Sequence, residues 1–413
     1  MGKKIIIGSV AAVAFAGAAF AAAGGSGAGN GNGWIVQLAG PTAPAASNGK
    51  GQAVAEVAAA EPKAGDKIEG SFICVFRAGS VGRGNERSEA ARSANAGGGS
   101  LKYVYDVALQ GFAVNASAQG VANMRAHNPN IAYCEQDQVA SIIDPVDAYA
   151  KPGGGGGGTQ PAQTTPPGIT RVGGGIAGAT GTAWVIDTGI DLDHPDLNVD
   201  VARSRNFVSR ESSPEDLNGH GTHVAGTIAA INNSIGVVGV APGAKVAAVR
   251  VLNRRGSGSY SDIIAGVDYV AATGKAGDVA NMSLGGGASD ALDAAVKAAA
   301  GKGIVFALAA GNESTSATTK SPARTEGPNV YTVSAVNKDD VWASFSNYGN
   351  PPIDWAAPGV SIQSTWLNGG YNTISGTSMA TPHVAGLYLL GGVKGDKFAI
   401  NDPDGQADPI AHH

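Results

Sequence analysis

Residues 374 to 390 read Ile374-Ser-Gly-Thr-Ser-Met-Ala-Thr-Pro-His-Val-Ala-Gly-Leu-Tyr-Leu-Leu390. The first part is a turn of small residues that ends at Ser378, and the rest has the small and apolar residues of a buried helix. We therefore expect Ser378 at or near a helix N-terminus, where backbone N–H groups lack partners and the helix dipole stabilises negative charge. Most Gly-Thr-Ser strings only cap helices or turn the chain, but this position suits a nucleophilic serine.

The composition limits the classes of protein that this chain can belong to. Its 413 residues leave room for two or three domains. With 63 glycines, 6% aromatic and 15% charged residues, it is a compact protein rich in small residues. A net charge of -5 and a pI near 5.8 provide no basic field, so nucleic acid is not expected as a partner.

The N-terminus has the three parts of a secretory signal peptide, predicted over residues 1–23. Lys3 and Lys4 precede an apolar run that ends at Phe20, and Ala21-Ala22-Ala23 follow. Because no later stretch reaches about 18 apolar residues, we expect no membrane anchor. The protein is predicted to be secreted and extracellular, with a periplasmic location left open. The alternative is a plain N-terminal helix.

Shifts in composition divide the rest of the chain into four parts. Residues 24–65 form a low-complexity spacer and residues 145–162 a glycine-rich linker. Between them, residues 66–144 alternate strand-like and helix-like patterns, which predicts a small α+β domain. This domain contains Cys74 and Cys134, and the sequence leaves open whether they form a disulfide.

The last part, residues 163–413, alternates apolar strands with alanine-rich helices. Strands are expected near 183–186, 245–252, 279–284 and 304–308, with helices opening near 220, 261 and 289. This order predicts an α/β fold with a mostly parallel sheet and helices on both faces. Ligands of such sheets bind beyond the carboxyl ends of the strands.

Three separate segments supply the parts of a nucleophilic site. Asp187 directly follows a strand, His220 opens a helix and Ser378 opens another. A serine needs an imidazole to take its proton, and the imidazole needs a carboxylate to fix its tautomer. Taken singly, the aspartate could cap a turn and His220 could pair with His223 on a metal.

Together these segments resemble the subtilisin-like serine proteases, with the proteinase K-like branch most similar. The resemblance covers about residues 163–391, through the motifs at 185–190, 220–226, 281–286, 309–312 and 376–386. It implies a three-layer fold and an endopeptidase that hydrolyses polypeptide substrates through an acyl-enzyme. It also implies a triad of Asp187, His220 and Ser378, with Asn312 as oxyanion donor. His223 and His383 are then expected to pack within their helices.

The family also implies where a substrate strand binds. The two expected backbone edges are Gly256, Ser257 and Gly258, and Ser283, Leu284 and Gly285. Ala309, Ala310 and Gly311 would wall a small apolar specificity pocket, which suggests a broad preference for apolar or aromatic side chains. Lys320 is placed near its rim, where it is hypothesised to recruit acidic side chains.

Calcium is the cofactor that the resemblance implies. The first site would use oxygens of Gln163, Asp196, Ile231, Asn233, Ile235 and Val237, a set that suits a hard cation. A second, weaker site would use Pro328, Val330 and Asp354. An ordinary asparagine-rich turn is the alternative for the first loop.

The domain at 66–144 resembles the family's inhibitory propeptide, a ferredoxin-like domain that assists folding and blocks the site until it is removed. The enzyme is then expected to be a monomer that cleaves itself between about Ile143 and Gln160. The chain departs from the family after Leu390, where it lacks the usual longer C-terminal helix and strands. Residues 326–328 look like a short insertion. A transpeptidase or cyclase, and a catalytically inactive binding protein, remain as alternatives.

Overall fold

The computed structural model describes residues 62–142, 160–209 and 211–413. The predicted signal peptide, nearly all of the spacer and most of the linker, including most of the expected maturation segment, lie outside these ranges. Among the described residues, no helix is both long enough and apolar enough to cross a bilayer.

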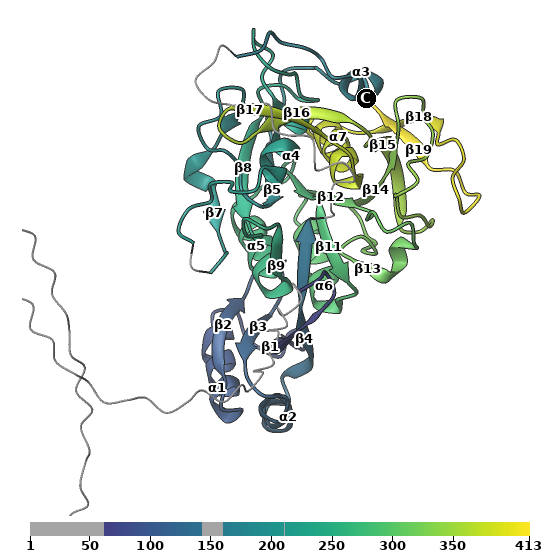
Figure 1. The fold of residues 1–413 in the computed structure, drawn as a ribbon. Coiled ribbons are helices and arrows are strands. Elements are labelled where there is room, and N and C mark those ends of the chain that lie inside the picture. The colour runs from purple at the N-terminus through teal and green to yellow at the C-terminus, as the bar shows by residue number, and fades with distance from the viewer. Residues whose placement is uncertain (1–61, 143–159, 210) are drawn as a thin grey trace, which may run out of the picture. The chain divides into compact units, whose positions relative to one another are not determined.

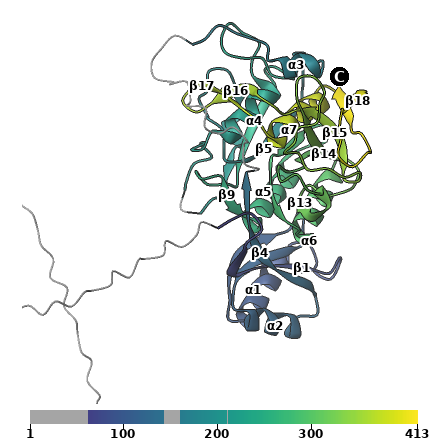
Figure 2. The same cartoon turned by 45° about the vertical axis from the view of Figure 1, so that its right-hand side comes forward.

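Residues 62–142, here called the N-terminal domain, form an antiparallel sheet with two helices (Figures 1 and 2). The strand order within this domain is β4-β1-β3-β2, and its elements follow one another along the chain as βαββαβ. The elements are β1 (Lys67–Phe76), α1 (Glu86–Ala96), β2 (Ser100–Tyr105), β3 (Gly111–Asn115), α2 (Ala118–His127) and β4 (Ile131–Ile142).

The two faces of this sheet bury different sets of side chains, as alternation along a strand requires. Cys74 and Phe76 share a core cluster with residues of α1 and α2. Ile73 and Val75, on the other face, belong to a large core cluster that they share with residues of the following domain, residues 160–413. Cys74 and Cys134 face each other across β1 and β4 and form a disulfide, which resolves the question that the sequence left open.

Residues 160–413, for which we keep the predicted name of catalytic domain, are built on a ten-stranded sheet. The strand order is β18-β19-β15-β14-β12-β10-β5-β8-β6, with β7 also paired to β8, and the strands from β6 to β19 run parallel. The predicted fold class is therefore confirmed. The strands are β5 (Thr182–Asp187), β6 (Asn198–Val199), β7 (Arg205–Asn206), β8 (Lys245–Arg250), β10 (Val279–Met282), β12 (Val305–Ala309), β14 (Val330–Val336), β15 (Ile353–Pro358), β18 (Lys394–Phe398) and β19 (Pro409–His412).

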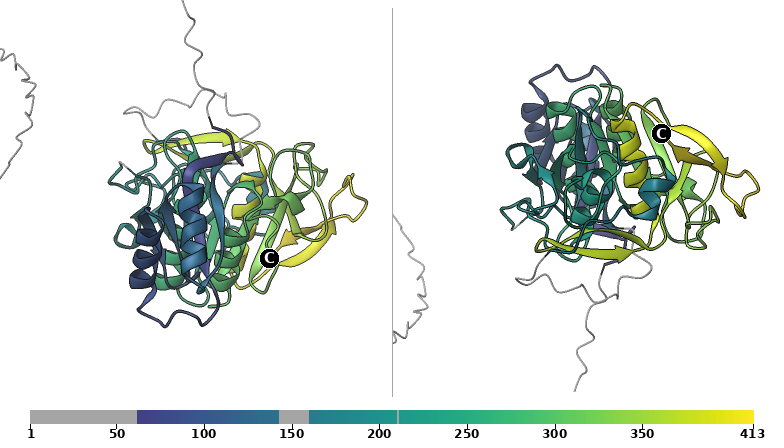
Figure 3. Two further views of the ribbon diagram at one scale, coloured as in Figure 1. Left: turned by 90° about the horizontal axis from the view of Figure 1, so that it is seen from below. Right: turned by 90° about the horizontal axis from the view of Figure 1, so that it is seen from above.

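Helices cover both faces of this sheet, which is why β5 is buried along its whole length (Figures 1 and 3). Helices α5 and α6 contribute to one core cluster, and α4 and α7 to another. The helices are α3 (Pro167–Arg171), η1 (Val201–Arg203), α4 (His220–Ala229), α5 (Tyr260–Thr273), α6 (Asp290–Ala300), η2 (Ala317–Thr319) and α7 (Thr377–Leu389). The smaller strands are β9 (Ser257–Ser259), β11 (Leu284–Gly287), β13 (Lys320–Ser321), β16 (Ile362–Trp366) and β17 (Gly370–Ile374).

The segment after Leu390, which is expected to lack the family's longer C-terminal helix and strands, forms two short strands. Strand β19 pairs with β15 at Ile410, and β18 forms an exposed hairpin partner. Ile410 and Ala411 are fully buried against the sheet edge. Burial of these two apolar side chains stabilises the pairing of the C-terminal segment with the edge of the sheet.

Candidate active site

Asp187 and His220 meet where β5 ends and α4 begins. The Nδ1 atom of His220 lies 2.8 Å from Oδ1 and 3.0 Å from Oδ2 of Asp187, and both side chains are buried. A carboxylate on this nitrogen holds the proton on Nδ1 and leaves Nε2 as the basic atom. Among the described residues, Nε2 has no hydrogen-bond partner. The Asp187–His220 pair therefore fixes the orientation of the imidazole and leaves its Nε2 atom able to accept a proton.

Asp216 organises the turn that presents His220, and sequence reasoning missed it. Its Oδ1 accepts hydrogen bonds from Thr188 Oγ1 and from the backbone of Asn218 and Gly219, each at 2.9 Å. Its Oδ2 accepts from the backbone N–H of Thr222 at 3.0 Å. This carboxylate satisfies N–H groups in the first turn of α4 that have no helical partner. An aspartate four residues before the histidine was the available signal.

Ser378 is the second residue of α7, after the N-cap Gly376. Its hydroxyl donates to the carbonyl of Ser283 at 3.2 Å, and the Ser283 hydroxyl donates to the carbonyl of Ser378 at 2.9 Å. These contacts join α7 to the loop between β10 and β11. Because α7 also packs on α4, the predicted serine and histidine lie at the starts of two contacting helices.

Asn312 follows β12 and is fixed by Thr377. Its Oδ1 accepts from both the backbone N–H and the hydroxyl of Thr377, each at 2.9 Å. The Nδ2 side must then face away from Thr377. A Cβ added to Gly376 would lie 2.9 Å from this Nδ2, so the amide donor lies against the start of α7.

The end of β4 lies between the two predicted substrate edges. Residues 139–141 pair antiparallel with β9, at Ser259, Gly258 and Ser257, and residues 141 and 142 pair with β11, at Gly285 and Leu284. The backbone N–H of Ile142 donates to the carbonyl of Gly256 at 2.7 Å. Gly256 has a φ of 76°, which favours glycine, and a Cβ added there would lie 2.8 Å from the side chain of Ile142.

The predicted specificity-pocket residues follow β12 and are all buried. Ala309 ends the strand, and Ala310 and Gly311 precede Asn312. Near them, Lys320 Nζ forms an ion pair with Glu313 at 2.8 Å. The Glu313 carboxylate also accepts from Asn347 Nδ2 at 2.7 Å. The ammonium group that was hypothesised to recruit acidic side chains is therefore already paired.

The residues predicted for the first calcium site converge on Asp196. Its carboxylate accepts from Asn233 Nδ2 at 2.8 Å, from Val237 N at 3.1 Å and from the Tyr371 hydroxyl at 3.2 Å. Gln163 Nε2 donates to the carbonyl of Ile231 at 2.9 Å, and the backbone of Ile235 donates to Asn233 Oδ1. Burial raises the pKa of Asp196, which is fully enclosed.

The residues predicted for a second site are less closely gathered. Asp354 on β15 accepts from the backbone N–H of Thr332 at 2.8 Å, while Pro328 and Val330 lie at the start of the neighbouring β14. Burial raises the pKa of Asp354 to about 6. Over the described ranges, no three His, Cys, Asp or Glu side chains form a group that could hold a metal ion.

His223 and His383 are fully buried within α4 and α7. One ring nitrogen of each contacts a backbone carbonyl, that of Ile362 for His223 and that of Met379 for His383, each at 2.9 Å. Burial lowers the pKa of His223 to about 3 and that of His383 to about 4. Both rings are therefore neutral parts of the helix packing.

The family model of the subtilases matches residues 184–390, which include all five motifs and lie over the site described above. The chain belongs to the subtilase family. This places Asp187, His220, Asn312 and Ser378 within the matched region.

Named subtilisin-type proteases are 40 to 50% identical to this chain over the residues that align. Alkaline serine exoprotease A of Vibrio alginolyticus is 43% identical over 291 residues, which cover 70% of this chain and 53% of that protein. Subtilisin NAT of Bacillus subtilis subsp. natto is 46% identical, over 64% of this chain and 65% of that protein. The subtilisin-like serine protease AsES of Sarocladium strictum is 42% identical, over 71% and 74%.

The match therefore spans about half the length of the Vibrio relative and just under two thirds of the Bacillus one. Among solved structures, a cold-adapted subtilisin-like serine proteinase is 42% identical, with a TM-score of 0.49. The aligned residues cover 56% of this chain and 88% of that one.

Proposed function

We propose that this chain is the precursor of a secreted serine endopeptidase that hydrolyses polypeptides through an acyl-enzyme. The observation that carries this proposal is the buried hydrogen bond between His220 Nδ1 and Asp187, which leaves Nε2 available as a base. The family membership supports the same chemistry.

In this mechanism the Ser378 hydroxyl turns from the Ser283 carbonyl toward His220 Nε2. Nε2 takes the hydroxyl proton as the oxygen attacks the substrate carbonyl, and Asp187 stabilises the imidazolium that forms. The imidazolium then gives its proton to the leaving amine. Water enters, gives a proton to the same nitrogen and attacks the acyl carbonyl. The imidazolium then returns this proton to the Ser378 oxygen as the acyl group leaves as the acid.

Two donors would stabilise the oxyanion of each tetrahedral intermediate. One is Asn312 Nδ2, aimed by the two hydrogen bonds from Thr377 to its Oδ1. The other is the backbone N–H of Ser378, at the positive end of α7. In the subtilisin enzyme itself, removal of the asparagine donor costs about 10²–10³ in rate. We expect a loss of about that size for Asn312→Ala.

A substrate would occupy the place of β4, as the middle strand between β9 and β11. Backbone pairing with these edges is independent of sequence, so the small apolar pocket at Ala309, Ala310 and Gly311 would select the side chain. A broad preference for apolar and aromatic residues follows. Polypeptides are the proposed partners, and we propose that the enzyme acts as a monomer.

The N-terminal domain is proposed to be the intramolecular inhibitor of this site. Support comes from residues 139–142, whose backbone occupies both substrate edges. Release would require a cut in the segment between about Ile143 and Gln160. The domain and its disulfide would then be lost from the mature enzyme.

We propose that Asp196, Asn233, Gln163 and the carbonyls of Ile231, Ile235 and Val237 bind calcium. Their chemistry fits, because Asp196 is a fully buried carboxylate that forms no ion pair with lysine or arginine in the described part of the chain. The amide groups of Gln163 and Asn233 can each be turned to present oxygen. The ion would stabilise this loop and takes no part in the reaction. Pro328, Val330 and Asp354 are proposed as a weaker second site.

Incubation of three full-length proteins with calcium tests the proposal. The wild type, Ser378→Ala and the control Ser344→Ala are produced without residues 1–23 and followed by gel and mass spectrometry. We expect the wild type and the control to be cut between 143 and 160, and Ser378→Ala to stay intact. Equal cutting of all three would indicate a contaminating protease. If all three stay intact although folded, an inactive binding protein becomes the better interpretation.

A mature form that transfers its acyl group to added amines more often than to water would instead favour the transpeptidase or cyclase. Product analysis by mass spectrometry, with and without an amine acceptor, distinguishes these reactions.

A further inference from the structure

Strand β4 carries a buried carboxylate that contacts the catalytic domain before the strand reaches the substrate edges. Asp137 is 1% exposed. It accepts hydrogen bonds from the hydroxyl of Ser261 at 2.5 Å and from its backbone N–H at 3.1 Å. A third hydrogen bond comes from Ser71 of its own domain at 3.0 Å. Within the described residues, the hydrogen bonds that Asp137 accepts from the catalytic domain all come from Ser261.

Ser261 is the second residue of α5, a helix of 14 residues. Its backbone N–H has no partner within the helix, and the helix dipole is positive at this end. Ser259, the N-cap, contacts the Ser261 hydroxyl at 2.8 Å. A carboxylate seated here thus receives two hydrogen bonds and a favourable electrostatic field.

This contact is in register with the substrate edges. From Asp137 the strand continues to Val139, which pairs with Ser259, and then to Ile142, which pairs with Leu284. Any polypeptide that binds to both edges in this register brings its residue five positions before that of Ile142 to Ser261. The backbone pairing is nonspecific, whereas the contact at Ser261 depends on the side chain.

We propose that Ser261 and the N-terminus of α5 form a distal specificity element of the mature enzyme. It favours polypeptide substrates with an aspartate in the place of Asp137. The inference rests on the proposed function and adds a determinant far from the specificity pocket at Ala309. It assigns to the mature enzyme a contact that the precursor makes with its own N-terminal domain.

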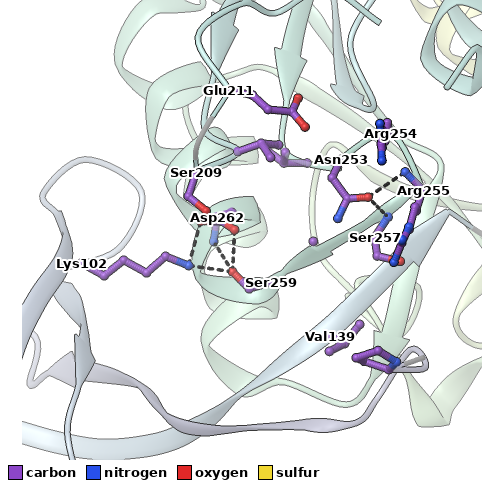
Figure 4. A pocket seen from close by; sticks show the side chains of 14 residues that line it. Lys102, Val139, Ser209, Glu211, Asn253, Arg254, Arg255, Ser257, Ser259 and Asp262 are labelled. Atoms are coloured by element: carbon purple, nitrogen blue, oxygen red, sulfur yellow. Dashed lines mark hydrogen bonds and ion pairs between the residues drawn. The ribbon is translucent and has the colours of Figure 1, made fainter. Parts of the chain in front are cut away.

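A neighbouring carboxylate limits the size of the preference. Asp262 lies 2.9 Å from Lys102 Nζ, and this lysine also contacts Ser259 at 3.0 Å (Figure 4). Lys102 belongs to the N-terminal domain, so a free substrate would face Asp262 without it. Beside this contact a groove of about 650 Å³ opens between the two domains. Solvent there screens both charges. We expect an aspartate to raise kcat/KM about 3- to 10-fold over asparagine.

Three chromogenic peptides test this element with the self-processed wild-type enzyme. The first has the sequence Gln136 to Ile142, followed by phenylalanine p-nitroanilide. The second carries Asp137→Asn. The third exchanges Asp137 with Gln138, which keeps the composition and net charge but turns the carboxylate to the other face of the strand. We expect the first peptide to have the highest kcat/KM, and its advantage to shrink in high salt.

The same peptides are then given to Ser261→Ala, in which the advantage should disappear, and to Ser261→Thr, which retains a hydroxyl and should restore it. Equal kcat/KM for the three peptides with the wild type overturns the inference and leaves the proposed function standing. An advantage that persists in Ser261→Ala also overturns it. If the wild type cleaves neither these peptides nor denatured casein, the proposed function itself fails. The comparison of the three peptides uses only the wild-type enzyme, so its outcome does not depend on whether Ser261→Ala folds.

Discussion

Asp216 holds Thr222 through two hydrogen bonds to one carboxylate oxygen, from the backbone N–H at 3.0 Å and from the hydroxyl at 2.7 Å. The other oxygen binds Thr188, the residue after Asp187. One buried carboxylate thus ties the end of β5 to the first turn of α4. It fixes the two elements that position the proposed base and its orienting carboxylate.

Replacing Asp216 should therefore reduce turnover without much effect on substrate binding. In Asp216→Ala the first turn of α4 loses its acceptor, and loss of such a cap costs about 1 kcal/mol or more. We expect kcat to fall about 10- to 100-fold with KM nearly unchanged, because about 1.4 kcal/mol in the barrier is tenfold in rate. Asp216→Asn keeps one acceptor oxygen and should lose less. Steady-state kinetics on the mature enzyme gives both constants.

Asp339→Asn, an exposed change on the catalytic domain, is the matched control and should behave as the wild type. A rise in KM at constant kcat in Asp216→Ala would contradict the positioning role.

Asp216 also marks where sequence reasoning stops. Asp187, His220 and Ser378 could be proposed from the sequence because each stands next to an apolar strand or opens a helix, and Asn312 could be proposed from the family motif. The role of Asp216 depends on Thr188, 28 residues away in the chain, and on how β5 and α4 come together. The position of Asp216 four residues before His220 is a local signal, but the sequence does not show that its carboxylate reaches Thr188.

The fold shows the same limit. The parallel sheet could be predicted because apolar strands such as β5 are buried on both faces. Strand β18 is exposed at every position and has no alternating pattern, so only its pairing with β19 makes it a strand. The Cys74–Cys134 disulfide likewise depends on the register of β1 and β4. Strand β18 and the disulfide thus depend on pairing between separate strands of the folded chain.

The ion pair of Lys320 with Glu313 leads to a prediction about specificity. Glu313 neutralises the charge of Lys320, so the ammonium group is not available to attract an acidic substrate side chain. We expect Glu313→Gln to raise kcat/KM for peptides with glutamate before the scissile bond about 3- to 10-fold relative to leucine, since partly exposed charge pairs contribute about 1 kcal/mol. Lys320→Ala should change the ratio in the opposite direction.

The measurement uses two peptides that differ only at this residue, at low and high salt. Asp339→Asn again serves as the control, because it removes one negative charge elsewhere. An unchanged ratio in Glu313→Gln would place Lys320 outside the specificity pocket.

Asp408 should make stability depend on pH in a defined direction. Burial raises the pKa of Asp408 to about 7, and the carboxylates of Asp402 and Asp404 add to this shift. The folded state thus prefers the protonated form. Its stabilising contribution is complete below the unfolded pKa of about 3.9 and is lost as the pH rises through about 7. Asparagine does not titrate, so the stability of Asp408→Asn relative to the parent should increase between pH 4 and 7.

Thermal and urea unfolding of the full chain in the Ser378→Ala background measures this difference without self-digestion. We expect a change in the relative free energy of unfolding on the order of 1–3 kcal/mol across this range, since one pKa unit corresponds to about 1.4 kcal/mol. Curves that stay parallel from pH 4 to 8 would contradict the assignment.

Asp196 provides the test of the proposed calcium site. In the Ser378→Ala background, calcium should raise the Tm of the full chain, because a ligand that binds only the folded state at about 100 times its Kd adds about 2.7 kcal/mol. Asp196→Asn removes the charge of the set formed with Asn233 and Gln163, so its Tm should no longer respond to calcium. Asp354→Asn alters the weaker proposed site and should keep most of the response. If Asp196→Asn and its parent gain equally from calcium while Asp354→Asn does not, the principal ion binds beside β14.

Because Asp196 is fully buried, Asp196→Asn also removes the cost of holding a charge there. It should therefore be at least as stable as the parent in EGTA and less stable only when calcium is present.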